Sequence, residues 1–219
     1  MPRLLFEKIG SAVWISHLDL MRLFQRAFKR AGLPLTHTQG FNPRPSVSIA
    51  LPLSVGTQSH CELLDFELDG EAVSVNEIQQ KLNGSLVEGI RVLQVYENGN
   101  KIKHLSYLDC AVTFAYDREV SEKDLSAITE LFCRKSLIVE KKGKSGVTQQ
   151  DIIPMIRKFD AYLRDGHTIC IQARICCQNP TLNPAQLTAA VQLYLPELAP
   201  DGVTYTREEI YDTEEKIFR

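Results

Sequence analysis

Apolar residues recur with the period of an α-helix over residues 16–31, which makes this segment the clearest helix that the sequence predicts. At about 100° per residue, one sector of the helix collects Leu20, Leu23, Phe24, Ala27, Phe28 and Ala31. Ser16 can cap the first turn and Asp19 completes a capping box, whereas Gly32 and Pro34 end the helix. We therefore expect a surface helix with one buried face.

Shorter patterns on both sides of this helix predict the other elements of the first half. Apolar or alternating segments indicate strands over residues 3–8, 46–55, 61–70 and 90–97. A short helix is expected over 75–86, ending near Gly84. The resulting order is strand, helix, two strands, helix and strand, with a loop over 37–46 inserted before the second strand.

The same order recurs after a polar stretch at 97–106. Strands are expected at 108–117, 136–142, 158–175 (a hairpin) and 202–212, helices at 121–135 and 183–195, and a mobile loop at 143–151. We predict an α+β chain of two ferredoxin-like (βαββαβ) units, with antiparallel sheets each covered by helices. The expected domains are residues 1–98 and 106–219.

The composition is that of an ordinary globular protein, with 219 residues, 44% hydrophobic and 24% charged. No stretch of about 18 apolar residues predicts a transmembrane helix. The start, "MPRLLFEKIG", is too short and too charged for a signal peptide. We therefore expect a cytoplasmic protein without a membrane partner.

The six cysteines match no ligand pattern, because none forms a C-x-x-C pair. They are interpreted as structural thiols, and disulfides are not expected in the cytoplasm. The sequence also lacks a P-loop, a G-x-G-x-x-G, an H-E-x-x-H and a G-x-S-x-G motif. We predict no metal site and no cofactor.

Charge is distributed unevenly along the chain. Residues 1–50 hold seven Lys or Arg against two acids, a net charge of +5 that leaves −7 for the remainder. On the predicted helix the bases gather opposite the apolar sector, at Arg22, Arg26, Lys29 and Arg30. This face is interpreted either as a contact for nucleic acid or phosphate, or as an ordinary solvated surface.

The loop "HTQGFNPRPS" at 37–46 has the composition of a stiff binding loop. Gly40 allows a turn with positive φ, and Pro43 and Pro45 stiffen the exit. Phe41 offers a ring for stacking, and the polar side chains suited to base edges or phosphates are His37, Gln39, Asn42 and Arg44. The alternative is a rigid turn whose amides satisfy nearby backbone groups.

His17 is the candidate catalytic residue. It stands at the start of the predicted helix, rotated toward the apolar side. It is either a partly buried structural histidine or a general base close to the 37–46 loop.

Residues 15–56, "ISHLDLMRLFQRAFKRAGLPLTHTQGFNPRPSVSIALPLSVG", closely resemble the radical-SAM-linked protein family, a bacterial domain of unknown function. Later segments such as "DIIPMIRKFD" and "REEIYD" continue the resemblance over essentially the whole chain. One departure is Arg44, where many relatives carry a histidine. Members are encoded beside a radical SAM protein or fused to its C-terminal end, so the resemblance implies a radical SAM partner. The C-x-x-x-C-x-x-C motif of such enzymes is not in this sequence.

Three functional hypotheses remain open. The first is an accessory binding module that presents RNA, or an RNA-associated substrate, to a separate radical SAM enzyme. The second is a metal-independent endoribonuclease with His17 as base, since paired ferredoxin-like units are also typical of CRISPR repeat-processing enzymes. The third is a protein-only scaffold that docks the radical SAM partner. Whether the chain is an enzyme is thus uncertain at this stage, and RNA as a partner is a hypothesis.

Overall fold

The computed structural model describes residues 1–143 and 146–219, and their packing divides the chain into two compact units. The first unit comprises residues 1–102 together with Arg219, and the second comprises residues 103–218. Within the described residues, no helix is both long and apolar enough to cross a membrane.

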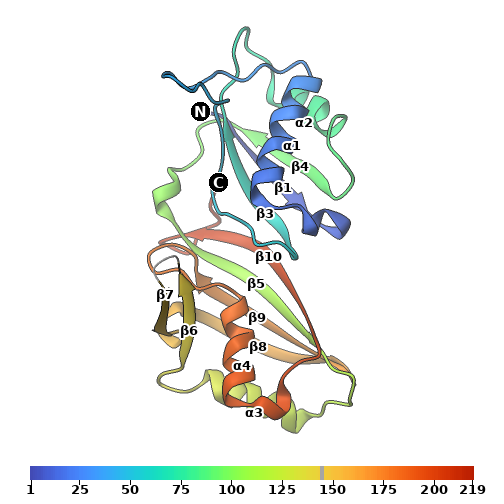
Figure 1. The fold of residues 1–219 in the computed structure, drawn as a ribbon, viewed down its shortest axis with the longest axis vertical. Helices are drawn as coiled ribbons and strands as arrows, with labels where there is room; N and C mark the ends of the chain where they lie inside the picture. Colours follow the sequence, from blue (N-terminus) through green and yellow to red (C-terminus); the bar gives the residue numbers. More distant parts are fainter. Residues whose placement is uncertain (144–145) are drawn as a thin grey trace. The chain divides into compact units, whose positions relative to one another are not determined.

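The first unit is a four-stranded antiparallel sheet with two helices (Figure 1). The strands pair in the order β4-β1-β3-β2. In chain order, the elements are β1 (Arg3–Lys8), the 3₁₀ helix η1 (Gly10–Trp14), α1 (His17–Arg30), β2 (Val47–Ile49), β3 (Thr57–Phe66), α2 (Val75–Asn83) and β4 (Ile90–Tyr96).

The second unit repeats this plan with one insertion. Its main sheet pairs in the order β10-β5-β9-β8, all antiparallel, and β6 and β7 form a separate hairpin. After the 3₁₀ helix η2 (Ile102–His104), the elements are β5 (Leu105–Ala115), α3 (Glu122–Phe132), β6 (Ile138–Gly143), β7 (Gly146–Asp151), η3 (Ile153–Met155), β8 (Ile156–Asp165), β9 (Thr168–Cys176), α4 (Ala185–Tyr194), η4 (Pro196–Leu198) and β10 (Gly202–Asp212).

The α+β class and the antiparallel sheets predicted from the sequence are confirmed, and two local predictions are wrong. The strand expected over 46–55 is limited to β2, because Pro52 has no N–H for a strand ladder. The loop expected over 143–151 contains β7, which pairs with β6; residues 144–145 of that segment lie outside the described residues.

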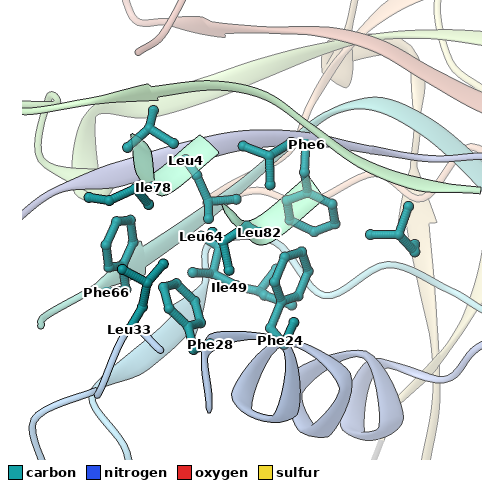
Figure 2. Packing of buried hydrophobic residues seen from close by; sticks show 14 of the residues in the cluster. Leu4, Phe6, Phe24, Phe28, Leu33, Ile49, Leu64, Phe66, Ile78 and Leu82 are labelled. Carbon is teal, nitrogen blue, oxygen red and sulfur yellow. The ribbon is translucent and has the colours of Figure 1, made fainter. Parts of the chain in front are cut away.

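Helix α1 packs on the first unit's sheet through its aromatic residues (Figure 2). Phe24 meets Phe6 of β1 edge to face with ring centres 4.7 Å apart, and Phe28 meets Phe66 of β3 at 5.0 Å. All four rings are fully buried. Aromatic pairs of this geometry add about 0.5–1.5 kcal/mol beyond the area that they bury. The rotation of α1 about its axis is therefore fixed.

Gly89, in the turn before β4, sets the position of η1 and hence the start of α1. Its carbonyl accepts a hydrogen bond of 2.8 Å from the Ile9 N–H. Its φ is +83°, and a Cβ added there would lie 2.4 Å from the Ile9 carbonyl oxygen and 2.9 Å from Cβ of Ala12. Only glycine permits this close approach of two backbone segments.

Replacing Gly89 by alanine should therefore destabilise the protein more than the same change at Gly10. Gly10 also has a positive φ, +58°, but nothing lies within 4 Å of its added Cβ. Gly10→Ala should lower the free energy of unfolding by about 1–2 kcal/mol from the left-handed backbone alone. Gly89→Ala should lower it by about 3 kcal/mol or more, because the backbone must also move. Urea denaturation measures both, and equal losses would contradict the contact.

Candidate functional site

Four basic side chains form one exposed face of α1, which we call the basic face: Arg22, Arg26, Lys29 and Arg30. Arg22 donates to the Asp19 carboxylate at 3.0 Å, and Arg30 donates to the Ser85 carbonyl at 2.5 Å. Within the described part of the chain, Arg26 and Lys29 have no hydrogen bond or ion pair. These two side chains are therefore available for an external anion.

Asp19 is the one acidic residue within α1. The Ser16 hydroxyl accepts a 3.2 Å hydrogen bond from the Asp19 N–H and donates one of 2.8 Å to its carboxylate. The hydrogen bond from Ser16, followed by that from Arg22, holds the pKa of Asp19 below its ordinary value. Ser16 thus caps the helix as predicted, but the Asp19 carboxylate accepts from the Ser16 hydroxyl instead of the Ser16 N–H that a capping box would use. Of the four bases, Arg22 is the one that bonds to Asp19 directly.

The base of the 37–46 loop is built like a short hairpin. The Thr38 N–H donates to the Arg44 carbonyl and the Ser46 N–H to the Thr36 carbonyl, both at 2.8 Å. Thr36 and Ser46 in turn bond to the backbone of Glu67, which follows β3. Both arms of the loop are therefore held in register and anchored to the end of a sheet strand.

The tip of this loop projects into solvent. Gly40 has a φ of +132°, a conformation that side chains disfavour. Gln39, Asn42 and Arg44 are exposed, and the relative exposure of Phe41 is 106%. The tip therefore presents an aromatic ring, two amides and a guanidinium on an anchored base.

A groove of about 410 Å³ lies between the C-terminal half of α1 and the base of the loop. Its lining residues are Gln25, Phe28, Lys29, Gly32, Leu33, Pro34, Leu35, His37 and Pro45. Lys29 of the basic face and His37 of the loop thus line the same groove, over an apolar floor. This volume is within the range of ligand pockets. One residue from each of the two sets that the sequence predicts separately therefore lines this groove; the other members, at positions 22, 26, 30, 39, 41, 42 and 44, do not.

His17 lies apart from this groove. It begins α1, twelve residues before Lys29, which corresponds to about 18 Å along the helix axis. The expectation that His17 lies close to the 37–46 loop is therefore wrong, because the loop follows the opposite end of α1 (Figure 1). Nδ1 of His17 is buried without a hydrogen-bond partner in the described residues. A general base is normally oriented by such a partner.

Trp14 is a surface residue that sequence reasoning misses. Its side chain is 72% exposed. A Cβ added at Gly56 would lie 3.5 Å from Cζ3 of the indole, so the ring packs over this glycine. The Gly56 N–H donates to the Val13 carbonyl at 2.9 Å, which ties the two segments together. No periodic signal covers the 3₁₀ helix that holds Trp14, so its exposure depends on tertiary packing.

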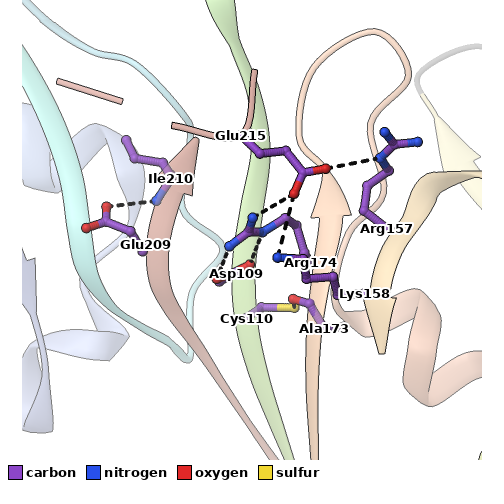
Figure 3. Close-up of polar contacts among 9 residues, drawn as sticks. All are labelled: Asp109, Cys110, Arg157, Lys158, Ala173, Arg174, Glu209, Ile210 and Glu215. Atoms are coloured by element: carbon purple, nitrogen blue, oxygen red, sulfur yellow. Dashed lines mark hydrogen bonds and ion pairs between the residues drawn. The ribbon is translucent and has the colours of Figure 1, made fainter. Parts of the chain in front are cut away.

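The second unit holds a separate polar cluster around Arg174 of β9 (Figure 3). The guanidinium donates to Asp109 of β5 at 2.7 and 2.8 Å and to Glu215 at 2.8 Å, and it lies 3.6 Å from the ring centre of Tyr211. Hydrogen bonding to Asp109 raises the pKa of Arg174, and hydrogen bonding to Arg174 lowers the pKa of Glu215. Because its donors are engaged, Arg174 is interpreted as a structural tie between two strands and the C-terminal turn.

This cluster predicts a dependence of stability on pH. The pKa of Glu215 is lowered by folding, so its contribution is present above its ordinary value of 4.5 and is lost as the pH falls through the lowered value. Between about pH 5 and pH 3, the free energy of unfolding of Glu215→Gln should fall less steeply than that of the unmodified protein. Urea denaturation at stepped pH measures this. The matched control is Glu214→Gln, which removes a neighbouring carboxylate that bonds to Lys216 and not to Arg174; equal slopes for the two variants would contradict the role of the Arg174–Glu215 pair.

Within residues 1–143 and 146–219, no group of three or more His, Cys, Asp or Glu side chains is placed to hold a metal ion. The six cysteines are free thiols. Burial raises the pKa of Cys110 and of Cys177 to about 12, so both are inert thiols at neutral pH.

A family model described as "Uncharacterized protein conserved in bacteria (DUF2344)" matches residues 2–184. No curated protein sequence matches the chain.

The solved structures that match the chain include the following two. One comes from "Crystal Structure of a Cbf5-Nop10-Gar1 Complex", with a TM-score of 0.52, 6% identity and coverage of 95% of this chain and 48% of that chain. The present chain therefore spans about half the length of that protein, and the likeness is one of fold alone. "Crystal Structure of an Unknown Protein from Galdieria sulphuraria" aligns over 94% of this chain and 96% of that chain at 13% identity, but its TM-score of 0.27 carries no structural argument.

Proposed function

The chain belongs to the bacterial family of uncharacterized proteins DUF2344, and from its site we propose that it is a non-catalytic module that binds RNA for a separate radical SAM enzyme. The proposal that the chain binds RNA rests on one observation: Lys29 of the basic face and His37 of the 37–46 loop line the same groove. RNA binding is argued from the geometry of the site, and the radical SAM partnership is argued from the family resemblance.

The basic face suits the phosphate backbone of a nucleic acid. Four bases and one acid lie along about four turns of helix, and Arg26 and Lys29 are exposed without partners in the described residues. Each phosphate that a base neutralises releases counterions, which gives an affinity that is independent of sequence and falls with salt. A solvated face of mixed charge would lack this property.

The loop suits the bases of an RNA strand. Its exposed amides, at Gln39 and Asn42, can pair with base edges, and Phe41 can stack on a base. The hydrogen bonds at the base of the loop hold it in place before binding, which reduces the entropy lost on association. Sequence-specific recognition of RNA mostly uses such contacts to unpaired bases.

The partnership with a radical SAM enzyme rests on the family resemblance of residues 15–56. That segment contains α1, the 37–46 loop and β2. The site proposed here is therefore the part of the chain that resembles the radical-SAM-linked family most closely. Co-purification of the chain with a radical SAM protein of the same organism, with and without ribonuclease treatment, would test whether the two associate and whether RNA is needed.

Each unit is further proposed to have a ferredoxin-like fold. The strand order β4-β1-β3-β2 of the first unit supports this, as does the order β10-β5-β9-β8 of the second, with the β6–β7 hairpin inserted before β8. In such a unit the helices cover one face of the sheet, so α1 has one buried side and one free side.

Removing two bases from the basic face should reduce the salt dependence of RNA binding. For Arg26→Gln/Lys29→Gln, the slope of log K against log salt should fall in magnitude by about 1–1.5, at about 0.7 per phosphate contact in a single strand. Fluorescence anisotropy of a labelled single-stranded RNA at stepped salt concentrations measures this slope.

The matched control is Lys123→Gln/Arg164→Gln, which removes two exposed bases from the second unit and changes the net charge equally. It should retain the original slope. The proposal fails if both double variants lose affinity to the same extent, or if the unmodified chain binds no RNA at low salt. RNA cleavage that disappears in His17→Ala would favour the endoribonuclease instead.

A further inference from the structure

We propose that α1 guides a single strand of RNA between two aromatic rings, with one base stacked on Trp14 before the helix and another on Phe41 beyond it. This inference rests on the proposed function, since it requires that the basic face binds RNA. It names the form of the nucleic acid and assigns a binding role to Trp14.

Trp14 has the two properties of a stacking platform. The indole is 72% exposed, so one face of the ring is open to a ligand. It is nevertheless held in place, because it packs over Gly56 and because the 3₁₀ helix that bears it is tied to Gly89 by the Ile9 hydrogen bond. Ordered, exposed aromatic rings are the groups on which unpaired bases stack in proteins that bind single strands.

On α1, which begins three residues after Trp14, a row of side chains runs along one side of the helix to the groove. Leu18, Arg22, Arg26 and Lys29 follow one another at intervals of three or four residues, within about 80° of the helix circumference. The helix of 14 residues is about 21 Å long, which is enough for several nucleotides. An RNA strand that follows this row would meet a basic side chain at nearly every turn of the helix.

Phe41 belongs to the loop whose base lies beyond the last side chain of the row, Lys29. The groove lined by Lys29 and His37 joins the end of α1 to the base of the loop that carries this ring. Because Phe41 is fully exposed and the loop is held in register at its base, the ring is presented without any contact that it would have to break. An aromatic ring thus lies beyond each end of the row of basic side chains.

Charge complementarity favours a nucleic acid over a protein as the occupant. A protein interface needs a fully buried apolar core with few charges. Here the exposed apolar residues Trp14 and Leu18 lie at the start of the helix and Phe41 lies in the loop after it, and the side chains between them, Arg22, Arg26 and Lys29, are cationic. A single strand is favoured over a duplex because the faces of paired bases are covered by their neighbours.

The chain contains one tryptophan, so its intrinsic fluorescence reports on Trp14 alone. The full chain is titrated with a single-stranded RNA of twelve nucleotides, with the same RNA as a duplex, and with inorganic polyphosphate. The single strand should quench the emission, whereas duplex and polyphosphate, which bind by charge only, should leave it nearly unchanged.

Trp14→Ala and Phe41→Ala should each weaken binding of the single strand by about 5- to 150-fold, the range found for loss of one stacked base. Their affinity for polyphosphate should remain that of the unmodified chain. Tyr162→Ala, at a 40% exposed aromatic residue of the second unit, is the matched control and should bind RNA normally. Phe41→Ala keeps the test valid even if Trp14→Ala is unstable, because a fully exposed ring contributes little to folding.

The outcomes separate this inference from the function on which it rests. Salt-dependent RNA binding with unchanged fluorescence, and with both alanine variants binding normally, would overturn the stacking and leave the RNA-binding module intact. If the chain bound neither RNA nor polyphosphate at low salt, the stacking inference and the proposed RNA-binding function would both be overturned. Fluorescence that responds to the radical SAM protein alone, without any affinity for RNA, would identify a protein-docking surface and overturn both as well.

Discussion

The site depends on the burial of one side of α1 against the first unit's sheet. Phe24 and Phe28 are fully enclosed among aromatic residues of β1 and β3, and this packing leaves the helix one possible rotation about its axis. The basic face is the geometric consequence of that rotation, because residues at positions 22, 26, 29 and 30 then point to solvent. The helix also sets the separation of the segments before and after it. A change in the core would therefore displace the surface site as a whole.

Local features of the site could be predicted from the sequence because they depend on neighbours along the chain. The helix expected over 16–31 is observed as His17–Arg30, with Ser16 as its cap, since periodicity and capping involve residues three or four positions apart. The exposure of the four bases follows from the same period. The stiffness of the 37–46 loop was expected from its prolines, but the bonds to Glu67 that anchor it were not, because they join residues about 20–30 positions apart.

Features set by distant pairs could not be predicted in this way. The groove requires α1 and the loop to face each other, and the exposure of Trp14 requires its packing over Gly56, 42 residues later in the chain. The prediction that His17 lies close to the 37–46 loop fails for a simpler reason. A helix rises by about 1.5 Å per residue, so a residue at its start lies far from a loop that follows its end. In the second unit, Arg174 meets carboxylates 65 and 41 residues away, and no local pattern indicates either pair.

The hairpin-like base of the 37–46 loop divides this segment into two parts that can evolve at different rates. Four of the bonds at its base join main-chain atoms of residues 36, 38, 44, 46 and 67, and such bonds can form whichever side chains those residues carry. The hydroxyls of Thr36 and Thr38 add two further bonds there. The tip, in contrast, exposes its side chains to solvent. Substitutions at the tip can therefore accumulate without loss of the fold, so related chains could diverge in what they recognise while they retain the same scaffold.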